Sequence, residues 1–117
     1  MSDMSGSEFQ CVREFLGLPA VWVADQLGVD RRTIYRWESE EFTLPDAASE
    51  RMRQWRALTD QTVGRVTVEV MSVPGSFLEA MQDGENGDGF PPSWQRMVCA
   101  RVAERTGREI VWMEVDA

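Results

Sequence analysis

A short segment of the chain concentrates side chains that could bind a nucleic acid: Arg31, Arg32, Tyr35 and Arg36. At about 100° per residue, a helix through this segment would carry all four within roughly 140° of one another. Ile34 and Trp37 would fall on the other side, where they could pack into a core. Because arginine donates paired hydrogen bonds to the edge of guanine, this face has the chemistry to read bases. A solvated charged surface is the plainer alternative.

Other reactive residue types are scarce. The 117 residues include no His and no Lys, which excludes an imidazole base or ligand and a Schiff-base lysine. Cys11 and Cys99 are too far apart in sequence for a CxxC motif, and we expect both to be small buried hydrophobes. The acidic stretch 83–89 does not match the pattern of a calcium-binding loop. Counted from Asp83, the fifth position is Gly87 and the twelfth is Trp94 rather than a glutamate. We therefore expect no catalysis, cofactor or metal, and an enzyme that relies on carboxylates alone is the least favoured class.

Capping residues and helical spacing predict the elements that would hold the arginine-rich segment. Ser5 or Ser7 can open the first helix, and Asp30 can cap the third. Gly28 suits the stop between the second and third, where the chain must reverse through positive φ. The fourth should point Leu58, among others, inward and fade near Gly64. The predicted helices are 5–16, 19–27, 31–38 and 45–64.

The second half has a different pattern. Valines alternate with polar residues in 65–71, which predicts a half-buried strand. Residues 76–82 suit a short helix, 92–106 a longer one, and 109–115 a second strand. The expected fold class is therefore α+β: a helical domain at 1–62, and a small β-α-α-β dimerisation domain at 63–117, joined near 60–64. We expect Trp55, Trp94 and Trp112 to be core or dimer contacts.

The stretch from Leu16 to Glu38, LGLPAVWVADQLGVDRRTIYRWE, resembles the helix-turn-helix of the lambda-repressor-like (XRE) family. The resemblance lies in the Leu-Gly-Leu at 16–18, the Leu-Gly-Val turn at 27–29 and the Trp-Glu pair at 37–38, together with Ala24 and Ile34. It implies a bundle in which 31–38 is the recognition helix that enters the major groove of DNA.

The same resemblance assigns roles to particular residues. It places the side chains of Arg31, Arg32 and Arg36 at positions that contact bases. Thr33 would contact a phosphate, and Tyr35 lies on the same face of the helix. The chain departs from the family where Ala20 replaces a glutamine that contacts the DNA backbone. The loop at 39–41 reads Ser-Glu-Glu where the family is often basic, and two carboxylates there would repel phosphate. Glu38 is expected to cap or pair locally.

A narrower resemblance extends beyond Trp37. Trp-Glu-Ser at 37–39 and TLPDAASERM at 43–52, followed by the predicted order of elements, are similar to a small family that includes anti-CRISPR-associated autorepressors. It implies that the C-terminal part dimerises the protein on an inverted repeat, in a phage or mobile element. Apolar positions predict that a homodimer would be held mainly by 66–71, 94–102 and 110–115. Val21 and Trp22 could extend the core or contact a second surface.

The expected function is sequence-specific binding of double-stranded operator DNA by a homodimeric transcriptional repressor. The alternative is a protein-interaction module of the antitoxin or antirepressor type, which Glu40, Glu41 and the net charge of -8 favour. No apolar run approaches the ~20 residues that span a bilayer, and the first residues do not resemble a signal peptide. A cytoplasmic location and no membrane partner are therefore expected, with a protein partner as a further possibility.

Overall fold

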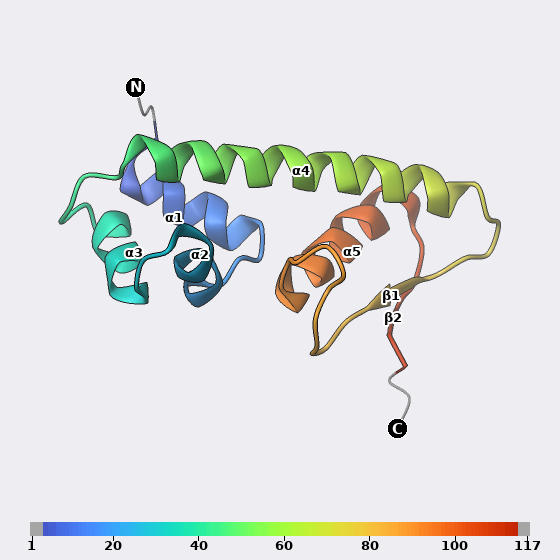
Figure 1. Cartoon of the computed structure of the whole chain (residues 1–117). Helices are drawn as coiled ribbons and strands as arrows, with labels where there is room; N and C mark the ends of the chain where they lie inside the picture. Colours follow the sequence, from blue (N-terminus) through green and yellow to red (C-terminus); the bar gives the residue numbers. More distant parts are fainter. Residues whose placement is uncertain (1–3, 115–117) are drawn as a thin grey trace. The chain divides into compact units, whose positions relative to one another are not determined.

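The computed structural model describes residues 4–114, which form five helices and a two-stranded sheet (Figure 1). The chain is therefore α+β. It divides into two compact units, Met1–Ala57 and Leu58–Ala117. None of the helices described is long and apolar enough to cross a membrane. The elements in chain order are α1 (Gly6–Phe15), α2 (Ala20–Leu27), α3 (Arg31–Glu38), α4 (Asp46–Met71), β1 (Leu78–Ala80), α5 (Pro92–Thr106) and β2 (Ile110–Trp112).

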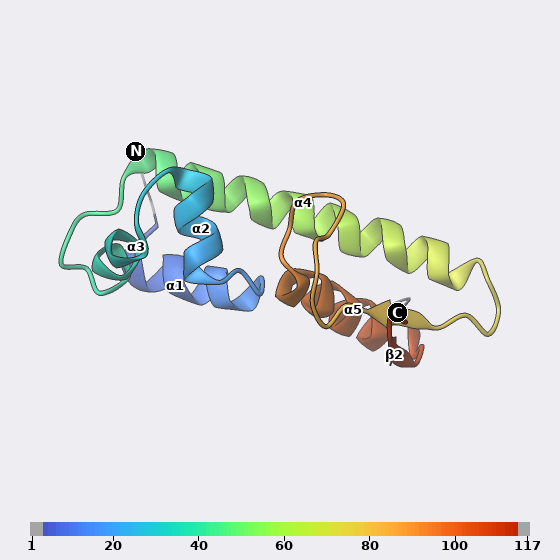
Figure 2. The ribbon, with the colours of Figure 1, turned by 60° about the horizontal axis from the view of Figure 1, so that its bottom comes forward.

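The first three helices begin and end at local signals in the sequence. Of the two serines that could open α1, Ser5 is the cap, and its Oγ accepts the Glu8 N–H at 3.1 Å. Gly28 ends α2 with a φ of 69°, a conformation that costs a glycine little because it has no Cβ. The predictions for these ends are confirmed. In Figures 1 and 2, α1, α2 and α3 lie together beside the N-terminal end of α4.

Unit 1 is organised around aromatic contacts between its helices. Phe9 of α1 meets Trp37 of α3 edge to face, with ring centroids 6.3 Å apart. Trp22 packs against Trp55 at 5.1 Å, so it extends this core, whereas Val21 remains exposed. The remaining buried side chains of the core include Leu16, Leu18, Val23, Ala24, Ile34, Leu44, Ala48 and Met52. Cys11 is exposed, contrary to expectation, and only Cys99 of the two cysteines is buried.

A close backbone approach joins the start of α1 to the end of α3. A Cβ placed on Gly6 would clash with the carbonyl oxygen of Trp37. The approach therefore requires a residue without a side chain. Gly6 is therefore a packing residue, although it lies within a helix.

Helix α4 corrects two predictions. It does not fade near Gly64 but continues to Met71, so the segment predicted as a strand at 65–71 is helical and the predicted junction near 60–64 lies within the helix. At helical spacing Thr59, Val63 and Val66 share one side, and the first two are fully buried. A half-buried strand would have turned Val68 inward together with Val66 and Val70, but Val68 is 70% exposed. Leu58 is also exposed rather than buried.

Unit 2 has the order helix, β1, α5, β2 rather than β-α-α-β. The segment 76–82, predicted as a helix, contains β1, which pairs in parallel with β2 so that Leu78 faces Ile110. The second strand is shorter than predicted, and Val115 lies outside the described residues. Helix α5 has the predicted bounds, and Gly107 ends it with a φ of 69°. Parallel pairing explains the connection, because two parallel strands need a crossover, which α5 supplies.

A buried hydrogen bond ties α5 to the C-terminal part of α4. The indole Nε1 of Trp94 donates to Oγ1 of Thr59 at 2.8 Å, and both side chains are buried. The indole ring of Trp94 also stacks with the ring of Phe90, with the ring centroids 4.1 Å apart. A buried indole N–H and a buried hydroxyl would each be costly without a partner. The pair therefore specifies how these two helices meet inside unit 2.

Candidate nucleic-acid interface

Helix α3 begins at a well-formed cap. One carboxylate oxygen of Asp30, Oδ1, accepts the backbone N–H of Thr33 at 2.9 Å and the Thr33 hydroxyl at 3.1 Å. The backbone hydrogen bond, and next the hydroxyl, lower the pKa of Asp30 below its ordinary value. The charged carboxylate of Asp30 thus holds the first turn of α3, from which Arg31 and Arg32 extend.

The inner face of α3 is buried as predicted. Ile34 is fully buried and Trp37 nearly so. Because Trp37 also meets Phe9 of α1, the rotation of α3 about its own axis is determined by large side chains. The opposite face of the helix must consequently point out of unit 1.

A buried ion pair anchors the C-terminal end of α3. Arg13 of α1 donates from Nε to Oε2 of Glu38 at 2.6 Å and from Nη2 to Oε1 at 3.0 Å. Its Nη1 donates to the Leu18 carbonyl at 3.1 Å. The hydrogen bond to Glu38 is the main cause that raises the pKa of Arg13. Such a bidentate pair satisfies both charges in the interior.

This pair corrects the expectation that Glu38 would cap or pair locally. Its partner is 25 residues earlier in the chain. One signal could have revealed it: Arg13 falls at helical spacing between Phe9 and Leu16, in the middle of the apolar face of α1. A charged residue on such a face is rarely buried without a partner.

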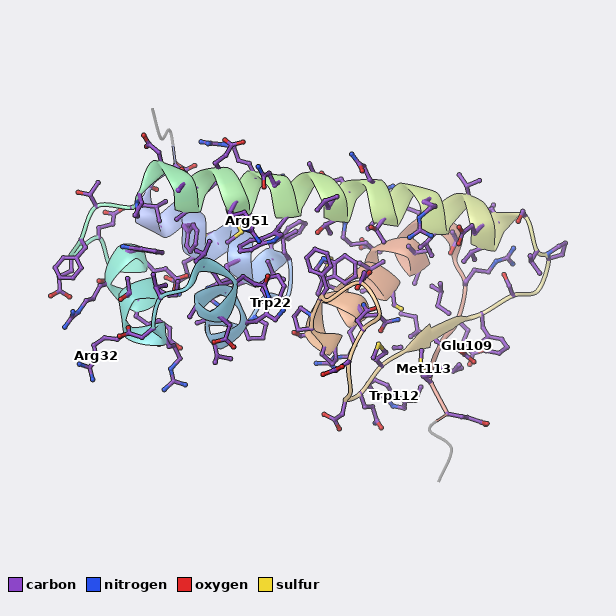
Figure 3. All side chains as sticks on the ribbon, viewed as in Figure 1. Trp22, Arg32, Arg51, Glu109, Trp112 and Met113 are labelled. Carbon is purple, nitrogen blue, oxygen red and sulfur yellow. The ribbon has the colours of Figure 1, made fainter. Side chains whose placement is uncertain are left out.

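On the outer face, three of the predicted site residues surround one hollow. Arg31, Arg32 and Tyr35 line an open depression of about 490 Å³ together with Asp30. All three are exposed. Figure 3 shows Arg32 extending from α3 away from the other helices of its unit. The two guanidinium groups and the phenol are thus available to one ligand.

The other two predicted residues are placed differently. The guanidinium of Arg36 lies over the ring of Phe42, 5.2 Å from its centroid, so Arg36 is directed toward the loop after α3. Cation–π contacts of this kind are modest at the surface, and a stronger ligand could compete for Arg36. The hydroxyl of Thr33 already donates to Asp30, so a phosphate contact would require that bond to be exchanged. Phe42 was not anticipated as part of the site.

The loop at 39–41, which follows α3, has two carboxylates in different surroundings. Glu40 adopts a positive φ of 65°. Its Oε1 accepts the N–H and the hydroxyl of Ser7, each at 3.5 Å, near the N-terminus of α1. A helix N-terminus favours negative charge, which offsets part of the repulsion that Glu40 could exert. Glu41 is exposed and has no such neighbour among the described residues.

No protein-family model matches the chain, and no curated protein sequence matches it. What the site can do must therefore be judged from its geometry.

Proposed function

We propose that this chain is a sequence-specific DNA-binding transcriptional regulator of the lambda-repressor-like (XRE) type. In this proposal α2 and α3 form a helix-turn-helix, and α3 enters the major groove. The observation that carries it is the division of α3 into two faces, one buried through Ile34 and Trp37 and the other exposing Arg31, Arg32 and Tyr35. An exposed helix face of this width is the element that major-groove readers use.

The side chains of α3 would have separate roles. Arg31 and Arg32 lie on its first turn, the end of a recognition helix that reaches furthest into the groove, and would donate to guanine edges. Tyr35 would contact bases or sugars from the next turn. Arg36 would leave the Phe42 ring to contact DNA beside the helix, and Thr33 would contact a phosphate.

A single helix-turn-helix reads only a few base pairs, so specificity generally requires two copies about one helical turn apart. We therefore propose that the protein acts as a homodimer on an inverted repeat. By its resemblance to anti-CRISPR-associated autorepressors, it would repress its own promoter, in the cytoplasm of the cell that carries it.

Selection from a random duplex library with the full-length protein tests this proposal directly. The expected result is an enriched inverted repeat whose half-sites are about 10 base pairs apart, centre to centre. The double variant Arg31→Ala/Arg32→Ala, with an unchanged circular dichroism spectrum, should enrich no motif. If the wild-type protein enriches none either, even at low salt, the assignment to DNA binding is wrong.

A protein-interaction module of the antitoxin or antirepressor type is the second candidate function. The net charge of -8 and the exposed Glu41 beside α3 favour it, because both oppose bulk attraction to DNA. The two candidates differ in whether the protein binds duplex DNA at low salt, where attraction to phosphate is strongest. A protein that binds no duplex of any sequence at low salt would support the second.

A further inference from the structure

The two strands of unit 2 leave one edge of the sheet closed and the other open. In the register that pairs Leu78 with Ile110, Leu78 donates to Glu109 O at 2.9 Å and Met113 donates to Ala80 O at 2.8 Å. Alternation along the strand then turns the N–H and C=O groups of Ile110 and Trp112 away from β1. Among residues 4–114, nothing bonds to these four groups. They form an unpaired strand edge.

The opposite edge, along β1, is occupied by a side chain. The amide of Gln95 donates from Nε2 to Glu79 O and accepts the Met81 N–H at Oε1, both at 2.8 Å. The side chain of Gln95 thus takes the place of a neighbouring strand. Arg96 adds a bond from Nη1 to Met81 O at 2.9 Å. Among the residues that the structure describes, the β2 edge is therefore the one left for an additional strand.

On one face of the sheet, the side chains of β1 are buried but those of β2 are not. Residues paired in parallel strands point to the same side of a sheet. Leu78 and Ala80 are 5% and 4% exposed, whereas Ile110 and Trp112, their partners in β2, are 41% and 55% exposed on that same side. Figure 3 shows Trp112 and Met113 on the last part of the described chain. The apolar surface continues to the open edge, where nothing within the described part of the chain covers it.

We propose that β2 pairs in antiparallel fashion with β2 of a second copy of this chain, about a two-fold axis at Val111. Ile110 then faces Trp112 of the other copy in each of two hydrogen-bonded pairs, and all four open groups of each strand are satisfied. The product is a four-stranded sheet in the order β1-β2-β2-β1. Each exposed Ile110 gains an aromatic neighbour on the buried face, a favourable cross-strand combination.

The same register is complementary in charge, which argues for a second copy as the occupant rather than an unrelated strand. Extending it by one pair on the same side places Arg108 opposite Glu114 of the other copy. Within one chain, Arg108 Nε is buried without a hydrogen-bond partner among the described residues. A two-fold axis supplies the Arg108–Glu114 contact twice, as an interface between identical surfaces requires. This inference rests on the proposed function, for which it identifies the dimer contact.

Variants with one added cysteine can report the register, since the remaining native cysteine, Cys99, is buried. They are made in full-length protein carrying Cys11→Ser, because Cys11 is exposed. At the axis, Val111→Cys would bring two Cα atoms to about 4.5 Å, within the range of a disulfide. With Ile110→Cys or Trp112→Cys, the two copies of the cysteine would be displaced by two residues, to roughly 8 Å, beyond that range.

The expected result with oxidised glutathione is a covalent dimer for Val111→Cys, and little for the other two variants. Preferential cross-linking at position 110 or 112 would overturn the register and with it the proposal. So would absence of cross-linking at all three.

Light scattering with gel filtration provides the second measurement, at micromolar concentration and without DNA. The full-length chain should have twice its mass of 13.3 kDa. Trp112→Ser should shift it to the monomer, whereas Phe77→Ser, which removes an equally exposed aromatic immediately before β1, should not. A wild-type monomer, or a Trp112→Ser dimer, would overturn the proposal. Because DNA is absent, a dimer that binds no operator would contradict the proposed function alone.

Discussion

Arg32 is the residue at which DNA reading can be tested most directly. It is exposed at the first turn of α3, beside Arg31 and Tyr35. Removing it should leave Ile34 and Trp37 in place, since these pack on the opposite face. The effect on DNA affinity can therefore be separated from the effect on folding.

Arg32→Ala should weaken binding to the selected operator by roughly 1–3 kcal/mol, the cost of a lost bidentate base contact. Fluorescence anisotropy with labelled operator measures this. The matched control is Arg65→Ala, which removes an exposed arginine paired with Glu69 on α4 and should change affinity little. Equal losses in the two variants would indicate a general charge effect rather than base reading.

The ion pair between Arg13 and Glu38 carries a second residue-level prediction. Both side chains are almost fully buried. Glu38→Ala would leave an uncompensated guanidinium in the interior, so we expect a loss of about 3–5 kcal/mol in the free energy of unfolding. Urea denaturation followed by circular dichroism measures it. The double variant Arg13→Met/Glu38→Leu should recover much of the loss, because no buried charge remains; a midpoint unchanged by Glu38→Ala would show that the pair contributes nothing.

At the scale of elements, two helical glycines should respond in opposite ways to the same substitution. Gly6→Ala places a Cβ against the Trp37 carbonyl and must push α1 away from α3, at a cost of roughly 1–3 kcal/mol as for other overpacked sites. Gly64→Ala has open space around its Cβ and should stabilise α4 by about 0.5–1 kcal/mol. Thermal unfolding compares them. Similar shifts of the two melting temperatures would contradict the close approach.

The cap of α3 should make stability depend on pH. The hydrogen bonds from Thr33 lower the pKa of Asp30 in the folded protein. The charged cap therefore contributes fully above the ordinary aspartate pKa of about 3.9, and its contribution is lost as the pH falls through the lowered value. Asp30→Asn can still accept the hydrogen bond but does not titrate. The advantage of the wild type in melting temperature should thus be constant near neutral pH and shrink below about pH 4; a constant difference down to pH 2 would contradict this origin.

At the scale of the whole molecule, the net charge of -8 must be overcome near the DNA. Glu41 is the exposed carboxylate of the loop after α3, whereas Glu40 lies at the N-terminus of α1. Glu41→Gln should therefore strengthen binding to any duplex more than Glu40→Gln does. The gain should be largest at low salt, where screening is weakest. Anisotropy titrations at several salt concentrations test it, and an identical affinity of Glu41→Gln and wild type throughout would place this loop away from the DNA.

Much of unit 1 could be predicted from the sequence because its signals are local. Ser5, Gly28 and Asp30 each determine a helix end through their own backbone or their nearest neighbours. Helical spacing in α3 also placed Ile34 and Trp37 on the buried side and Arg31, Arg32 and Tyr35 on the exposed side, as the structure has them. The direction of Arg36 could not be predicted, because it depends on Phe42, a loop residue whose position is not encoded by any periodic pattern.

The segment 65–82 was predicted wrongly in both its elements, and the reason is tertiary. Alternating valines favour a strand only weakly, whereas extending a helix that already exists adds a hydrogen bond per residue without a new nucleus. Burial of Val63, and of Thr59 bonded to Trp94, stabilises that extension. Strand β1 forms because β2 and the Gln95 amide, distant in sequence, satisfy its two edges. Local chemistry therefore determined where the helices of unit 1 begin and end, and only contacts between distant residues decided which segments of unit 2 became strands.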